Sequence, residues 1–170
     1  MLKPAVLFKE EIQNYFKSIY YTEEMMFVAG GIENWLPDIA ECPEENSFQY
    51  AILDNNENLI GYVGFKVNWY DSAAYNFGLI SFDKGNVNIG FAMKEVIDKI
   101  ANEFHLHSME WRVVGGNPVE DAYDRFCKKF NGHKYIIHDA NRDMRGNYRY
   151  AALYEIIFGE NLDGCDKVGF

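Results

Sequence analysis

The stretch Asp83–Phe104, "DKGNVNIGFAMKEVIDKIANEF", joins a short loop with two glycines directly to an amphipathic helical pattern. Apolar residues recur every three or four positions along it, with charged residues between them. The stretch Ala73–Phe82, "AAYNFGLISF", precedes the loop and is typical of a strand. We therefore expect a strand, a loop and a helix in immediate succession. The loop is either a phosphate cradle at a helix N-terminus or a plain connection.

A second helix is marked in "NPVEDAYDRFCKKF", Asn117–Phe130, which follows the strand pattern "SMEWRVVGG". Asn117 is expected as N-cap, Pro118 as the first helical residue and Glu120 as the acid of a capping box. Acidic residues early in this helix and basic residues late in it suit the helix dipole. The inner face is expected to hold Val119, Ala122, Tyr123, Phe126, Cys127 and Phe130.

The rest of the chain predicts further short elements. Helices are expected over 9–20 and, capped by Thr22, over 22–28, and the acidic, proline-containing segment 32–46 is expected to be irregular. "SFQYAILD" and "LIGYVGFKVNWY" predict a hairpin, in which Gly61 and Gly64 indicate a bulge or a close backbone approach. "KYIIHD" and "YRYAALYEIIF" predict two antiparallel strands around a polar turn, before a loosely held tail.

Composition limits the class of protein. The chain of 170 residues shows no repeat or linker, so a single domain over 1–170 is expected. A formal net charge of -10 disfavours nucleic acid and anionic membranes as partners. No apolar stretch approaches the roughly 20 residues of a membrane helix. The three cysteines form no CxxC pair, and the histidines lack metal-ligand spacing. We expect a cytoplasmic protein without a metal site.

The order of these elements resembles the GNAT family of acyl-CoA-dependent N-acetyltransferases, most closely over 59–157. The family's pyrophosphate loop reads Arg/Gln-x-x-Gly-x-Gly/Ala. On "GNVNIG" this pattern places Gly85 at the Arg/Gln position, Asn88 at the first glycine and Gly90 at the last. After glycine, asparagine most readily adopts left-handed backbone, so Asn88 is expected to keep the path of the loop. Lys84 is close enough to supply positive charge.

The resemblance implies a mixed α+β fold with a central, mostly antiparallel, twisted sheet flanked by helices. It implies direct transfer of the acetyl group of acetyl-CoA to a primary amine of a small molecule or peptide, with no metal. The strands ending at Phe82 and Val114 are expected to splay apart, and an N–H near 80–82 to stabilise an oxyanion. The positions expected to bind the cofactor are Ile80, Ser81, Phe82, Gly85, Asn86, Val87, Asn88, Ile89, Gly90 and Asn117.

The resemblance also implies that Tyr123 returns a proton to the departing thiolate, although its spacing from Asn117 is short and Phe126 competes for the position. The general base stays unassigned among Asp71, Glu110 and the acids of 33–45. Simpler roles stand beside these: Asn117 as a helix cap only, and Tyr123 as a core aromatic residue.

Other residues are interpreted structurally. Cys127 is expected to pack in the core, and the arginines of the closing hairpin to form a solvated tip rather than a phosphate contact. Those arginines are Arg142, Arg145 and Arg149.

Two other functions stay open. One is a catalytically degenerate relative that binds acyl-CoA or serves as an interaction module. The other is an α+β domain that binds a protein partner through its aromatic-rich surface segments. The acceptor amine is not identified, and a homodimer is left open.

Overall fold

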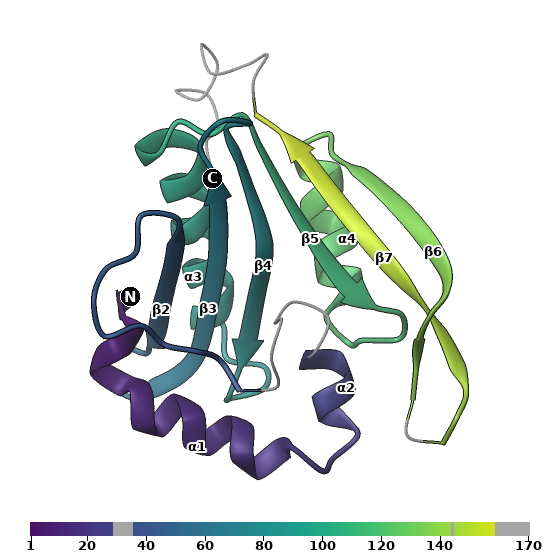
Figure 1. Cartoon of the computed structure of the whole chain (residues 1–170), viewed down its shortest axis with the longest axis horizontal. Coiled ribbons are helices and arrows are strands. Elements are labelled where there is room, and N and C mark those ends of the chain that lie inside the picture. Colours follow the sequence, from purple (N-terminus) through teal and green to yellow (C-terminus); the bar gives the residue numbers. More distant parts are fainter. Residues whose placement is uncertain (29–35, 144, 159–170) are drawn as a thin grey trace.

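The computed structural model describes residues 1–28, 36–143 and 145–158. Its centre is a seven-stranded sheet of order β1-β2-β3-β4-β5-β7-β6 (Figure 1). The strands are β1 (Leu2–Pro4), β2 (Ser47–Leu53), β3 (Leu59–Asn68), β4 (Ala73–Ser81), β5 (Ser108–Val114), β6 (His133–Arg142) and β7 (Tyr148–Ile157). The helices are α1 (Lys9–Ile19), α2 (Glu24–Val28), α3 (Asn88–Asp98) and α4 (Glu120–Lys129). A 3-10 turn (Ala5–Phe8) precedes α1, and a π-helical turn (Lys99–Glu103) extends α3.

Neighbouring strands pair antiparallel, with the single exception of β4 and β5, which run parallel. The helix α3 makes the crossover between these two strands, as parallel pairing requires. The predicted mixed α+β class with a mostly antiparallel sheet is confirmed. Within the described residues, no helix is both long and apolar enough to span a bilayer.

The sheet separates two hydrophobic cores. Alternate side chains of a strand point to opposite faces, so each strand contributes to both cores. On one face, Phe77, Trp111 and Val113 pack with residues of α3 and α4, including Tyr123. On the other face, the core around α1 contains Ile12, Phe16, Tyr62 and Ile80, with Phe82 packed against it. Any opening through the sheet therefore connects two different helical layers.

The two glycines predicted to distort the second hairpin strand do so. A Cβ added at Gly61 would lie 2.6 Å from the carbonyl oxygen of Ile80, which shows a close approach of β3 to β4. The register between these strands shifts between Gly64 and Lys66, which marks the irregularity expected of a bulge. The close approach at Gly61 lies opposite Ser81 at the end of β4, where the candidate site is found, and the register shift lies opposite the middle of β4.

The predicted start of α4 is wrong. The helix begins at Glu120, and Val119 rather than Asn117 stands at its N-cap. The Asn117 side-chain oxygen accepts a hydrogen bond from the N–H of Val119 at 3.1 Å, which closes a local turn instead of starting the helix. The Glu120 carboxylate accepts from the N–H of Gly116 at 3.2 Å, one residue before the expected partner.

Other boundaries also shift. The Thr22 hydroxyl donates to the carbonyl of Ile19, so it closes the end of α1 instead of capping α2, which begins at Glu24. Strand β6 extends through Arg142 into the predicted polar turn. The segment 32–46 is predicted to be irregular, and its described part, 36–46, contains no helix or strand. Residues 32–35 and the tail 159–170 lie outside the described residues.

Candidate active site

A slot opens where the two parallel strands separate. Strands β4 and β5 are in register at Ala73 with Ser108, and the last registered pair is Phe77 with Trp111. Beyond that pair β4 continues to Ser81 and β5 to Val114. The backbone groups on the facing edges of these strand ends have no ladder partner in the neighbouring strand. The predicted splay of these two strands is therefore present.

A pocket of about 510 Å³ lies at this slot. Its wall is formed by both strand ends, by the loop before α3, by the entry to α4 and by α2. The lining residues are Glu24, Phe27, Phe77, Gly78, Leu79, Ile80, Ser81, Lys84, Gly85, Ile89, Arg112, Val113, Asn117, Pro118, Val119 and Tyr123.

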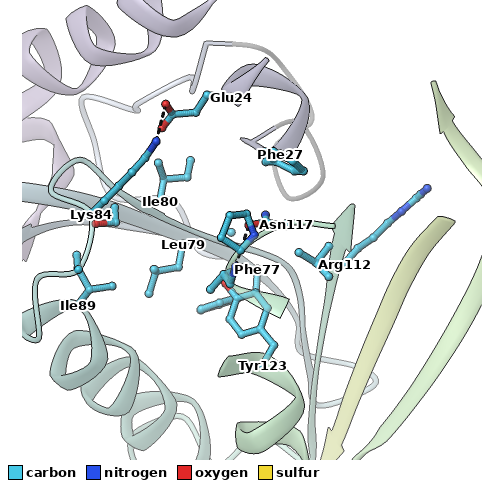
Figure 2. Close-up of a pocket in the computed structure, with 16 residues that line it drawn as sticks. Glu24, Phe27, Phe77, Leu79, Ile80, Lys84, Ile89, Arg112, Asn117 and Tyr123 are labelled. Atoms are coloured by element: carbon cyan, nitrogen blue, oxygen red, sulfur yellow. Dashed lines mark hydrogen bonds and ion pairs between the residues drawn. The ribbon is translucent and has the colours of Figure 1, made fainter. Parts of the chain in front are cut away.

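The pocket reaches both helical layers. Figure 2 shows Glu24 and Phe27 coming from α2 on one side and Tyr123 coming from α4 on the other. Ile89 from α3 lies on the same side as Tyr123 (Figure 2). An elongated molecule in the slot and a second molecule entering past α2 would thus meet between β4 and β5.

The structure brings together some of the residues predicted to form the site. Ile80, Ser81, Gly85, Ile89, Asn117 and Tyr123 all line the pocket, and Phe82, Asn86, Val87, Asn88 and Gly90 are not among the lining residues. The ring of Phe82 stacks on that of Tyr15 at 4.0 Å, on the α1 face of the sheet. Pocket residues that sequence reasoning did not single out include Phe77, Arg112 and Val113.

The backbone N–H groups at the end of β4 divide between two directions. The N–H of Phe82 donates to the carbonyl of Ile60 at 2.8 Å, so it cannot serve an oxyanion, contrary to the prediction that included it. Because backbone groups alternate along a strand, the N–H of Ile80 also faces β3. The N–H groups of Leu79 and Ser81 face the slot instead.

In the loop before α3, the residue with left-handed backbone conformation is not the predicted one. Asn88 is the first residue of α3, so its expected left-handed conformation is wrong. Gly85 takes that conformation instead, with φ of +86°. A Cβ added at Gly85 would meet nothing within 4 Å, so there is open space beside its backbone. Because Asn88 is helical and Gly85 supplies the left-handed residue, position 88 does not require a glycine.

The first N–H groups of α3 are already engaged. Asn86 accepts from the N–H of Asn88 through its side-chain oxygen at 3.0 Å and from the N–H of Ile89 through its carbonyl at 3.1 Å. The N–H of Gly90 donates to the carbonyl of Val87 at 3.1 Å. An anion at this helix end would therefore compete with the Asn86 side chain.

Tyr123 combines a buried ring with a free hydroxyl. Its side chain is only 8% exposed, and its ring lies 5.7 Å from that of Trp111. Among the described residues, none forms a hydrogen bond with the Tyr123 hydroxyl, which faces the pocket. Burial raises the pKa of Tyr123 above its ordinary value of 10.0, so the phenol keeps its proton at neutral pH. Phe126, the competing position, packs on Trp111 and Phe130 outside the pocket lining.

Glu24 is the carboxylate that sequence reasoning missed. Its Oε1 accepts from the Tyr15 hydroxyl at 2.9 Å, and its Oε2 accepts from Lys84 Nζ at 3.1 Å (Figure 2). Burial and the neighbouring Glu24 raise the pKa of Tyr15, which keeps Tyr15 a donor. The sequence predicts only a short helix over 22–28 here, and nothing in the local sequence of Glu24 marks a pocket. Two of the acids predicted as candidate bases, Asp71 and Glu110, do not line the pocket. Asp71 accepts a hydrogen bond from Asn68 near the start of β4, whereas the pocket lies at the end of that strand.

The structural interpretation agrees with the contacts for Cys127 and only in part for the arginines. Cys127 is a free, buried cysteine whose Sγ lies 3.4 Å from the carbonyl of His133. Arg149 pairs with Asp143 at 3.5 Å inside the hairpin and donates to the carbonyl of Gly115, so it is not part of a solvated tip as predicted. The exposed Arg145 pairs at 2.8 Å with Glu23, which lies outside the hairpin. In the described part of the chain, no group of three or more His, Cys, Asp or Glu side chains could hold a metal ion.

Solved structures with a similar architecture are known. No protein-family model and no curated protein sequence matches the chain. The structure is similar to spermidine/spermine N-acetyltransferase SpeG from Vibrio cholerae in complex with manganese ions, with a TM-score of 0.60, 17% identity and coverage of 72% of this chain and 71% of that chain. It is also similar to a dodecameric structure of spermidine N-acetyltransferase from the same organism, with a TM-score of 0.59, 18% identity and coverage of 72% and 71%.

The chain has the GNAT fold. The resemblance inferred from element order is confirmed at the level of the fold, of which this chain is a divergent example. Because the sequence identities are 17% and 18%, the likeness carries the GNAT fold but not the acceptor. Function must be argued from the pocket itself.

Proposed function

We propose that the protein is an N-acetyltransferase that transfers the acetyl group of acetyl-CoA directly to a primary amine. The observation that carries this proposal is the pocket between the splayed ends of β4 and β5, with the Tyr123 phenol entering it from α4. An acyl thioester and an amine can reach this pocket from opposite faces of the sheet. Tyr123 is the residue we assign to protonate the leaving group.

The residues present fit an acyl-CoA. The open space beside Gly85 and Gly90 lets a large group approach the backbone there. The slot-facing N–H groups of Leu79 and Ser81 have no ladder partner in β5 and are available to an extended arm. The predicted cofactor residues from Gly85 to Gly90 would hold the pyrophosphate at the start of α3, where the helix dipole favours an anion. Asn117 and Ile80–Ser81 would contact the arm, since they line the pocket.

The chemistry at the pocket follows from groups of this chain. Acetyl-CoA supplies an activated thioester when bound. The slot-facing N–H of Leu79 or Ser81 stabilises negative charge that develops on an acyl oxygen, because a preorganised donor loses little energy to reorientation. Glu24 accepts a proton from the incoming ammonium, directly or through a water molecule. Tyr123 holds a proton at its phenol oxygen until the sulfur leaves, since burial keeps its pKa high.

Binding of acetyl-CoA and turnover are tested in that order. Acetyl-CoA should raise the melting temperature, and a ligand at about 100 times its Kd adds about 2.7 kcal/mol to the free energy of unfolding. Release of free thiol is then measured with a panel of primary amines. Absence of a thermal shift at saturating acetyl-CoA would overturn the proposal.

One observation favours the alternative of a catalytically degenerate relative that serves as an interaction module instead of binding acyl-CoA. The Asn86 side chain occupies the N–H of Asn88, which a pyrophosphate would otherwise take. The absence of both a thermal shift with acetyl-CoA and thiol release with any amine would support this alternative.

A cytoplasmic location and a homodimer also stay predictions. The free cysteines Cys42 and Cys127 are compatible with a reducing compartment. Strand β6 is an edge of the sheet with exposed Tyr135, Ile136 and Ile137. Antiparallel pairing of two β6 strands about Ile136 would place Tyr135 opposite Ile137. Sedimentation should show a dimer that Ile136→Lys converts to a monomer, and a monomeric parent protein would contradict this.

A further inference from the structure

The charged residues that line the described part of the pocket are Glu24, Lys84 and Arg112. The side of the pocket where we propose that acetyl-CoA binds is lined, by contrast, by uncharged residues such as Ile89, Asn117 and Tyr123. Trp111 and Val113 belong to the core of the α3/α4 face, so Arg112 between them points to the α1/α2 face. Figure 2 shows Arg112 extending away from α4 and also away from Glu24, so its exposed side chain must turn inward for the guanidinium to reach a ligand in the pocket. The charged groups therefore gather where the acceptor enters.

Glu24 already binds a primary ammonium in this structure. Lys84 Nζ lies 3.1 Å from Oε2, and the Tyr15 hydroxyl orients Oε1 at 2.9 Å. The Lys84 side chain is 76% exposed and that of Glu24 is 29% exposed, so the ion pair is solvated and contributes little to stability. An acceptor ammonium can replace or join Lys84 at little cost. The contact with Lys84 thus shows where the ammonium group of an acceptor would bind Glu24.

Arg112 carries a charge that no residue described by the structure neutralises. Its side chain is exposed, and within the residues that the structure describes it forms no ion pair or hydrogen bond. The residue in register with it on β7 is Leu153, which offers no acid. A guanidinium at a pocket wall is suited to bind a carboxylate through two parallel hydrogen bonds.

The balance of charge decides the kind of acceptor. The described lining holds two cations and one anion, so a second ammonium on the acceptor would meet Arg112 or Lys84 instead of an acid. The overall charge of -10 does not compensate, because salt screens exposed charges beyond about 10 Å at 0.1 M ionic strength. A polyamine is therefore a poor match, although the similar solved structures are of spermidine acetyltransferases.

We propose that the acceptor is a primary amine that also bears a carboxylate, with its ammonium at Glu24 and its carboxylate at Arg112. Phe27, which also lines the pocket, contacts the carbon chain between the two charged ends. This proposal rests on the acetyltransferase function and narrows its substrate class to aminocarboxylates. A small amino acid and a peptide with a free carboxyl terminus share this chemistry.

The test compares matched acceptors that differ only by the carboxylate. Thiol release is measured with β-alanine, γ-aminobutyrate and ε-aminocaproate against ethylamine, propylamine and pentylamine, and with a tripeptide against its C-terminal amide. At least one carboxylate-bearing member should exceed its partner in kcat/KM by about 10- to 100-fold, the effect of a hydrogen bond to a charged group. The tripeptide pair separates a peptide acceptor from a small one, and spermidine should be poor.

Variants assign the effect to the two residues. Arg112→Met should abolish the preference for the carboxylate, because it lowers kcat/KM for the carboxylate-bearing member of each pair. Arg125→Met removes an exposed arginine of α4 outside the pocket lining and should keep the preference. Glu24→Gln should raise the KM of the amine by about 10- to 100-fold and should also lower kcat, since Glu24 is the proposed base, while the thermal shift caused by acetyl-CoA stays at the wild-type value.

The outcomes separate this inference from the function on which it rests. A preference that survives Arg112→Met, or no preference in any matched pair, overturns the inference while leaving an acetyltransferase. No thiol release with any amine overturns the acetyltransferase function instead. In that case the same pairs are compared as ligands by thermal shift, where a carboxylate-dependent stabilisation lost in Arg112→Met supports the pairing and its absence refutes it.

Discussion

Tyr123 places a protonated phenol in the pocket without a hydrogen-bond partner among the described residues. Tyr123→Phe removes one oxygen and keeps the ring against Trp111, so we expect a melting temperature close to that of the parent protein. Turnover should fall by about 100-fold or more, as for loss of a general acid. Thiol release measures the rate.

Tyr135→Phe is the matched control for this change. Its hydroxyl lies on exposed β6 and donates to Glu155 at 3.3 Å, away from the pocket lining. This variant should keep full turnover. If Tyr123→Phe also keeps full turnover and an unchanged pH profile, the role assigned to Tyr123 is wrong.

Two glycines near the site differ in what surrounds them. A Cβ at Gly61 would lie 2.6 Å from a backbone oxygen of β4, whereas a Cβ at Gly90 would meet nothing within 4 Å. Gly61→Ala should lower the free energy of unfolding by about 1–3 kcal/mol, because the strands must separate. Gly90→Ala lies inside α3 and should raise it by about 0.5–1 kcal/mol. Urea unfolding checks both, and equal effects would contradict the geometry.

At the scale of elements, hydrogen bonds and ion pairs join helix α4 to the hairpin formed by β6 and β7. The Tyr150 hydroxyl donates to Glu120 at 2.8 Å, and Lys134 Nζ lies 3.0 Å from Glu120 and 2.7 Å from Asp124. Burial alone would raise the pKa of Glu120, but the hydrogen bonds from Tyr150 and Lys134 hold it below its ordinary value of 4.5. The network sets where α4 lies and therefore where Tyr123 enters the pocket.

Glu120→Ala tests this fastening. It leaves the Tyr150 hydroxyl and the N–H of Gly116 without their acceptor, so the free energy of unfolding should fall by about 1–3 kcal/mol. Asp121→Ala removes the neighbouring exposed acid of the same helical turn and should cost about 0.3–1 kcal/mol through the helix dipole alone. Chemical unfolding of both variants measures the difference. Equal losses would show that the network adds nothing beyond helix charge.

At the scale of the whole molecule, buried tyrosines make stability depend on alkaline pH. Burial raises the pKa of several phenols above 10.0. Above pH 10 the unfolded chain loses phenolic protons that the folded chain retains, so the free energy of unfolding falls as pH rises. The stabilising contribution is complete below the ordinary pKa and disappears as pH passes the raised values. The residues concerned are Tyr15, Tyr50, Tyr62, Tyr123 and Tyr154.

Urea unfolding between pH 8 and pH 11 measures this slope. Tyr123→Phe should make the fall of the unfolding free energy with pH less steep, because the contribution of one phenol is removed. A slope that Tyr123→Phe leaves unchanged would show that its phenol titrates normally.

Much of the fold could be predicted because the patterns that define its elements are local. The apolar period from Ile89 to Ile100 is sufficient for α3, and alternation over 47–53 is sufficient for β2. Predictions failed where a side chain had two local partners to choose from. Thr22 bonds backward to Ile19 instead of forward to α2, and Asn117 closes a turn instead of capping α4.

The sequence by itself determined the elements, their order and the GNAT-like class, because periodicity and turn residues act over a few neighbouring positions. Only the tertiary structure decided that Glu24, Arg112 and Tyr123 share one pocket. These residues lie on three separate elements and meet because α3 carries the chain across the sheet, so that β4 and β5 run parallel and then part. No local pattern encodes that meeting, since it depends on the packing of both hydrophobic cores against one sheet.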